Sequence, residues 1–155
     1  MAASDLDVIN TLNGLIETCK DGEKGFQAAA ENIQDPNLKE LCQNYAQQRA
    51  RFVADLQVAV RRLGGDPESG GSIAGALHRG WMSMKGTVTG HSDEALISEA
   101  ERGEDVAKAT YEKALKSDLP LDVQAVVERQ YIQVKEAHDR IRSLERQLEL
   151  AEKKV

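Results

Sequence analysis

The sequence has few aromatic residues, few prolines and no long apolar run, and each shortage excludes a class of protein. Aromatic residues make up 4% of the 155-residue chain, which contains only three prolines. No apolar run approaches the roughly 18 residues that a transmembrane helix needs, so we expect no membrane as a partner. The first residues, MAASDLDVIN, lack the basic and apolar regions of a signal peptide. These absences predict a cytoplasmic protein.

Basic charge is also in short supply. The chain carries 20 Lys and Arg against 26 Asp and Glu, for a formal net charge of -6. A domain that binds nucleic acid usually presents a strongly basic face. The acidic balance therefore argues against nucleic acid as a partner.

Cysteine is too scarce for a fold that depends on disulfides. Cys19 and Cys42 fall on apolar helical faces on either side of the QDPN turn. Counted from that turn they differ in height by about nine residues, or roughly 13 Å along a helix. A disulfide needs Cα atoms within about 7 Å. We predict that both cysteines are reduced thiols packed in the core.

Residues that favour helices are abundant, and no stretch alternates apolar and polar residues long enough to predict a strand. Four long patterns place apolar residues at alternating spacings of three and four, as the buried face of a bundle helix does. The fold class is therefore all-α. The predicted helices cover about residues 5–34, about 37–63, about 92–117, and about 121 to near the C-terminus.

The three connections differ in length, and this difference predicts the topology. QDPN and DLPL are tight turns, whereas about residues 64–91 join the second helix to the third. A connection of that length lets the second and third helices run parallel across the full bundle. One long crossover in a four-helix bundle is the ferritin-like arrangement. We expect residues 1–155 to form one such domain.

The crossover carries a short amphipathic pattern of its own. Ile73, Leu77, Trp81 and Met84 recur at helical spacing, which predicts a short extra helix. One interpretation is a lid over the outside of the bundle. The other is a homodimer contact through Trp81, since Trp and Met are enriched at interfaces.

Each long helix carries one polar residue near the middle of its predicted inward face. These residues are Glu23, Gln48, Glu104 and His138. An ionised carboxylate is not buried alone, because its desolvation costs several kcal/mol. We therefore expect Glu23 and Glu104 to meet either a metal ion or a basic side chain.

Two glycines, Gly22 and Gly25, flank Glu23 inside the first predicted helix. Each costs about 1 kcal/mol of helix stability relative to alanine. Their position predicts either a close approach of another group to this helix or a local distortion.

Five segments carry a resemblance to a known family: LNGLIETCKDGEKGF, LGGDPESGG, ALHRGW, EAERGED and KEAHDRI. The chain resembles the bacterial ferritin-like four-helix-bundle proteins of unknown function, over about residues 6–144. The resemblance implies a ferritin-like fold and no settled biochemical role.

The resemblance also allows a comparison with ferritin-like di-iron proteins. In those proteins two helices each give a Glu, and two others each give a Glu-x-x-His pair. By this resemblance Glu23 and Glu104 correspond to the single carboxylates, and His138 corresponds to one of the histidines. Half of the ligand positions are thus kept.

The other ligand positions hold Gln48, Arg51 and Lys135, and two of these replacements are basic. This departure argues against a complete di-iron centre. One prediction is that Arg51 or Lys135 neutralises the core carboxylates in a buried ionic network that fixes the helix register.

The alternative prediction is a single divalent metal ion held by Glu23, Glu104 and His138, with Glu101 nearby on the same helix face as Glu104. Two carboxylates and an imidazole suit iron, manganese or zinc. The sequence leaves both predictions open.

Two functions follow from these alternatives. The first is a structural or binding protein, related to stress, that acts through its surface without full di-iron chemistry. The second is a metal-binding or redox protein with a degenerate site in the middle of the bundle. No Ser-His-Asp or Cys-His arrangement supports nucleophilic catalysis, and no Gly-rich loop follows a strand to bind phosphate. We therefore predict no catalytic or cofactor-binding residue, and the question of enzymatic activity stays open.

Overall fold

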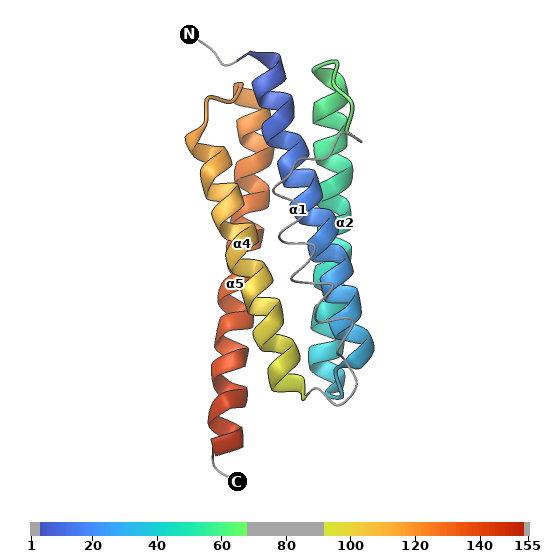
Figure 1. Cartoon of the computed structure of the whole chain (residues 1–155), viewed down its shortest axis with the longest axis vertical. Coiled ribbons are helices and arrows are strands. Elements are labelled where there is room, and N and C mark those ends of the chain that lie inside the picture. The colour runs from blue at the N-terminus through green and yellow to red at the C-terminus, as the bar shows by residue number, and fades with distance from the viewer. Residues whose placement is uncertain (1–3, 68–91, 154–155) are drawn as a thin grey trace.

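The computed structural model describes residues 4–67 and 92–153, which form long α-helices without a strand (Figure 1). This confirms the predicted all-α fold class. The helices in this part of the chain are α1 (Asp5–Asn32), α2 (Pro36–Arg62), α4 (Asp93–Lys116) and α5 (Leu121–Lys153).

Capping side chains fix where the helices begin. The Ser4 hydroxyl accepts a hydrogen bond from the Asp7 amide at 3.2 Å, and the Ser92 hydroxyl accepts one from the Ala95 amide at 3.2 Å. At the start of α2, the Asp35 carboxylate accepts from the Asn37 amide at 2.8 Å. Each such cap stabilises its helix by about 1 kcal/mol because it satisfies a free backbone amide.

The helix directions agree with the predicted topology. α1 and α2 are antiparallel, α4 and α5 are antiparallel, and α2 and α4 run in the same direction (Figure 1). α1 packs against α2 and α4, while α5 packs against α4 and, over a smaller area, against α2. The predicted crossover helix with Trp81 lies outside the described residues.

One carboxylate joins the α1–α2 turn to the start of α4. Asp93 accepts hydrogen bonds from the backbone amides of Gln34 at 2.7 Å and Asp35 at 2.9 Å. Residues almost sixty positions apart are thereby held together at this end of the bundle. This contact fixes the position of α4 relative to the α1–α2 pair.

The core consists of two apolar clusters separated by a polar layer. One cluster contains Leu12, Ile16, Phe52 and Val127, towards the end at which α1 begins. The other fills the opposite half of the bundle, and its largest fully buried members are Phe26, Ile33, Leu96, Ile97 and Ile141. The functional candidates lie between the two clusters.

The cysteines lie in this core as free thiols, as predicted. Burial raises the pKa of Cys19 to about 11 and that of Cys42 to about 12. A thiol becomes a reactive nucleophile when it ionises, so at neutral pH both act as packing groups.

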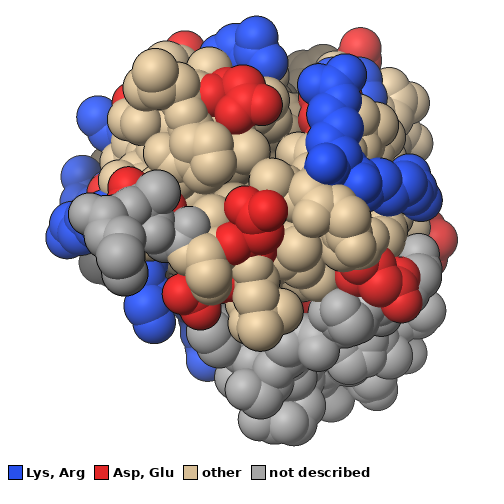
Figure 2. Space-filling model, turned by 90° about the horizontal axis from the view of Figure 1, so that it is seen from above, with Lys and Arg blue, Asp and Glu red and all other residues tan. Residues whose placement is uncertain are grey.

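The surface shows no basic face on the view in Figure 2. Lys and Arg side chains lie towards the margins of this end of the bundle, with Asp and Glu side chains scattered among uncharged residues. Among the described residues no helix is both long and apolar enough to cross a membrane.

Candidate functional site

A buried ion pair lies in the polar layer at the middle of the bundle. Arg49 of α2 donates a hydrogen bond from Nη2 to Oε2 of Glu104 on α4 at 2.7 Å, and both side chains are 1% exposed. Neither charge would be tolerated alone here, because each would bear a desolvation cost of several kcal/mol. The two residues therefore depend on each other for their place in the core.

The neighbouring face of α1 is shaped to receive the guanidinium. A Cβ atom at Gly22 would lie 3.3 Å from Nη1 of Arg49, tighter than most Cβ contacts. The guanidinium carbon lies 5.5 Å from the centre of the Phe26 ring, within the range of a cation–π contact. This confirms for Gly22 the predicted close approach to the helix.

The second oxygen of Glu104 is in a different situation. Oε1 is buried and has no hydrogen-bond partner in the described part of the protein. A buried acceptor left unpaired costs about 1–3 kcal/mol. A further donor or cation at this oxygen would therefore be stabilising.

A chain of hydrogen bonds adjoins the ion pair. The Tyr111 hydroxyl donates to Oε1 of Gln130 at 2.7 Å, and Gln130 Nε2 donates to the Phe52 carbonyl at 3.3 Å. Cys19 Sγ lies 3.1 Å from the Tyr111 hydroxyl oxygen. Because that hydroxyl already donates to Gln130, the thiol is the donor in this contact. Burial holds the pKa of Tyr111 well above its usual range, so the chain is neutral at physiological pH.

His138 lies in the same layer but faces other partners. Its Nε2 is 2.5 Å from Oδ1 of Asp105, and its Nδ1 is 3.1 Å from Oδ1 of Asp139. Burial lowers the pKa of His138, but the hydrogen bonds to Asp139 and Asp105 outweigh it and leave the pKa above its ordinary value of 6.5. The geometry favours a protonated imidazole that donates from both nitrogens.

The four predicted metal ligands are not brought together as one cluster. Glu104 is bound to Arg49 and His138 to two aspartates, while Glu23 is only half-buried on α1. The carboxylate of Glu101 lies 3.9 Å from Nε of Arg142. Metal binding by Glu23, Glu104, His138 and Glu101 stays a prediction.

The basic partner of the core carboxylate is Arg49, so the expectation of Arg51 or Lys135 was wrong. Both of those side chains are exposed. The predicted inward face of α2 placed Gln48 inside, but Gln48 is half-buried and donates a hydrogen bond to Gln133 of α5 at 3.3 Å. The buried stripe of a bundle helix is at least 100° wide, so the apolar spacing of α2 is consistent with either Gln48 or Arg49 facing the core. Ala46 and Phe52, three positions to either side of Arg49, were the signal in the sequence that Arg49 faces inward.

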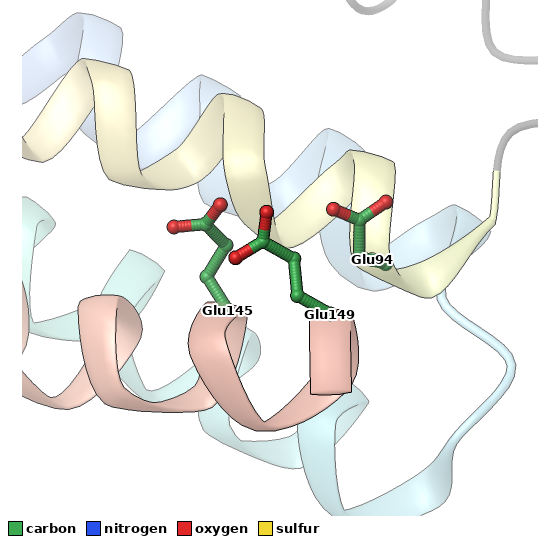
Figure 3. Close-up of side chains that lie close together, drawn as sticks. All are labelled: Glu94, Glu145 and Glu149. Carbon is green, nitrogen blue, oxygen red and sulfur yellow. The ribbon is translucent and has the colours of Figure 1, made fainter. Parts of the chain in front are cut away.

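A separate acidic cluster was missed by the sequence reasoning. Carboxylate oxygens of Glu94 on α4 and of Glu145 and Glu149 on α5 lie within 4.8 Å of one another (Figure 3). A hydrogen bond that the protonated Glu145 carboxyl donates to Glu101 raises the pKa of Glu145 above its usual value. The side chains of the cluster are partly or fully exposed, so water solvates them and they do not require a cation.

Comparison with known proteins identifies the family. The model of the family described as Domain of unknown function (DUF2383) matches residues 7–117, which run from α1 to the end of α4. The chain belongs to this family. The matched residues include Arg49 and Glu104 but not α5, which carries His138. No curated protein matches the chain.

The fold has a counterpart among solved structures. A two-domain protein from Anabaena variabilis ATCC 29413, containing DJ-1/ThiJ/PfpI-like and ferritin-like domains, superposes with a TM-score of 0.77 at 18% identity. The match covers 94% of this chain and 41% of that protein, so this chain spans about two fifths of its length. This DUF2383 member therefore has a ferritin-like four-helix fold.

A ferritin-like fold raises the question of a di-iron centre, and the residues of this DUF2383 chain do not fit one. A di-iron centre needs carboxylates and histidines that are free to bind metal. Here a guanidinium is bound to Glu104, and His138 is held between Asp105 and Asp139.

Proposed function

We propose that this protein is a structural or binding member of the ferritin-like fold that works without di-iron chemistry. The observation that carries the proposal is the 2.7 Å ion pair between Arg49 and Glu104, with both side chains buried. A resident positive charge fills the electrostatic role that metal ions play in di-iron proteins. The functional surfaces then lie on the outside of the bundle.

Electrostatics supports this assignment quantitatively. A metal ion about 4 Å from the guanidinium would be repelled by about 4 kcal/mol per unit of charge, at an effective dielectric constant of about 20. Arg49 remains charged at any physiological pH, and its contact with Glu104 raises its pKa further despite burial. Metal binding at Glu104 would therefore require Arg49 to move away.

Metal content is the direct test of the proposal. Protein produced in iron-supplemented medium is expected to contain far less than one iron per chain and to show no oxidation of ferrous iron by oxygen or peroxide. A control variant, Arg49→Gln, removes the positive charge while keeping hydrogen-bond donors. About two irons per wild-type chain, together with rapid ferrous oxidation, would contradict the proposal.

A second candidate function is a metal-binding or redox protein that uses Glu23, Glu104, His138 and Glu101. The observation in its favour is Oε1 of Glu104, which is buried and lacks a hydrogen-bond partner among the described residues. Such an oxygen would bind iron, manganese or zinc as a carboxylate ligand. Elemental analysis of the wild type against Glu23→Ala and His138→Ala tests this candidate, which requires lower metal content in both variants.

A further inference from the structure

A groove separates α2 from α5 near the end at which α2 finishes. Its volume is about 340 Å³, and it lies where these two helices pack over a small area. Val58, at the centre of the α2 side, is 45% exposed. The remaining apolar lining residues are Ala59, Leu63, Val123 and Val126.

Four charged side chains line the same groove, two from each helix. Asp55 and Arg62 come from α2, and Asp122 and Arg129 come from α5. Each pair is seven positions apart, or about 10 Å along a helix. Within residues 4–67 and 92–153 none of the four forms a hydrogen bond or ion pair.

The helix directions determine how these charges face one another. Because α2 and α5 are antiparallel (Figure 1), Asp55 lies at the level of Arg129, and Arg62 lies at the level of Asp122. The sign of the charge therefore alternates around the groove. The four charges sum to zero, so the groove has no net attraction for a nucleic acid or for a strongly charged ligand.

We propose that this groove is a homodimer interface and that its occupant is a second copy of the chain. In a dimer with twofold symmetry, the same patch meets itself. With the axis parallel to the helices, Asp55 meets Arg129 of the second copy, and Arg62 meets its Asp122. With the axis across the helices, Asp55 meets Arg62 of the second copy, and Asp122 meets its Arg129.

Both orientations pair every charge with its opposite, and a patch of one sign could not do this in either. The apolar lining around Val58 lies inside the ring of charges. This arrangement matches an interface with an apolar centre and a polar rim. Covering Val58 would remove from water an apolar side chain that the monomer leaves partly exposed.

Light scattering after size exclusion tests the interface. The full chain is expected at twice its 17.0 kDa mass at micromolar concentration. Arg62→Glu and Val58→Asp are expected to shift it to the single-chain mass. Arg61→Glu is the matched control, since Arg61 is exposed on the same turn of α2 but does not line the groove. Circular dichroism checks that each variant remains helical.

Paired charge reversals make the test specific. Asp55→Arg alone is expected to weaken the dimer at least tenfold. Adding Arg129→Asp restores it if the axis is parallel to the helices, and adding Arg62→Asp restores it if the axis lies across them. The proposal is overturned if the wild type is a monomer, or if neither Arg129→Asp nor Arg62→Asp restores the dimer of Asp55→Arg. It is also overturned if Trp81→Glu dissociates the dimer while Arg62→Glu does not. These results are independent of metal content, so they leave the proposal about the core untouched.

Discussion

Two ion pairs start from adjacent residues of α4, and they differ in how much water reaches them. Glu104 and Arg49 are both 1% exposed, whereas His138 is 5% exposed and its partner Asp105 is 59% exposed. The first pair is sealed between two apolar clusters, and the second opens to solvent at one end. The same electrostatic attraction should therefore have very different consequences for stability in the two places.

Breaking the buried pair should produce the largest effect. Arg49→Met leaves the Glu104 carboxylate buried without a counter-charge, and we expect the free energy of unfolding to fall by about 3–5 kcal/mol. Urea denaturation followed by circular dichroism measures this loss. Arg51→Met is the matched control because Arg51 is exposed on the same helix.

The double variant Arg49→Met with Glu104→Leu sharpens this prediction. Replacing a whole buried ion pair with apolar residues is often neutral or stabilising. The double variant should therefore be more stable than Arg49→Met alone, with a strongly non-additive cycle. If the stability losses of Arg49→Met and Glu104→Leu simply added in the double variant, the broken ion pair would not explain the loss in Arg49→Met.

A moderate effect is expected at Gly22, where α1 makes room for the buried arginine. Alanine normally stabilises a helix by about 1 kcal/mol relative to glycine. Here its Cβ would lie 3.3 Å from Nη1 of Arg49, so the guanidinium must shift within a closely packed site. We expect Gly22→Ala to lower the free energy of unfolding by about 1 kcal/mol.

Making the same substitution in the Arg49→Met variant tests whether the contact with Arg49 is the cause. In an Arg49→Met chain the contact is gone, and Gly22→Ala should become stabilising. Gly14→Ala is a control, since nothing lies within 4 Å of a Cβ built at Gly14. A loss at Gly22 that persisted without Arg49 would point to a different steric cause.

The sequence predicted the helices well because their signals are local. Apolar spacing and the QDPN and DLPL turns act within a few residues, and the structure places the helix ends close to the predicted positions. The need for a charge partner in the core was also predictable, because a buried Glu104 cannot stand alone.

The identity of the partners was not predictable in the same way. Arg49 and Glu104 are separated by 55 positions, and which of two adjacent residues on α2 faces inward depends on the rotation of the whole helix. His138 was expected to face the same site as Glu104, yet it binds Asp105, one residue further along α4. A step of one residue turns a side chain by about 100° around a helix, so small rotations exchange one partner for the other.

The solvent-exposed pair, His138 with Asp105, should have the smallest effect on the free energy of unfolding, and this effect should depend on pH. The pKa of His138 in the folded state lies above its ordinary value of 6.5, because the hydrogen bonds to Asp139 and Asp105 outweigh burial and the nearby charge of Lys108. The contribution of His138 to stability is thus fully present below pH 6.5 and is lost as the pH rises through the folded-state pKa. We expect this loss to stay below about 1 kcal/mol because Asp105 and Asp139 are largely exposed to water.

Urea denaturation at a series of pH values, with an NMR titration of the imidazole, measures both sides of this linkage. His138→Gln should remove the dependence on pH, and Asp105→Asn should bring the pKa of His138 down. The Arg49–Glu104 pair should show no corresponding change between pH 6 and 8, because guanidinium groups stay protonated there. If Asp105→Asn left the pKa of His138 unchanged, the contact at 2.5 Å would not be the source of its shift. The two pairs would then differ in geometry as well as in exposure to water.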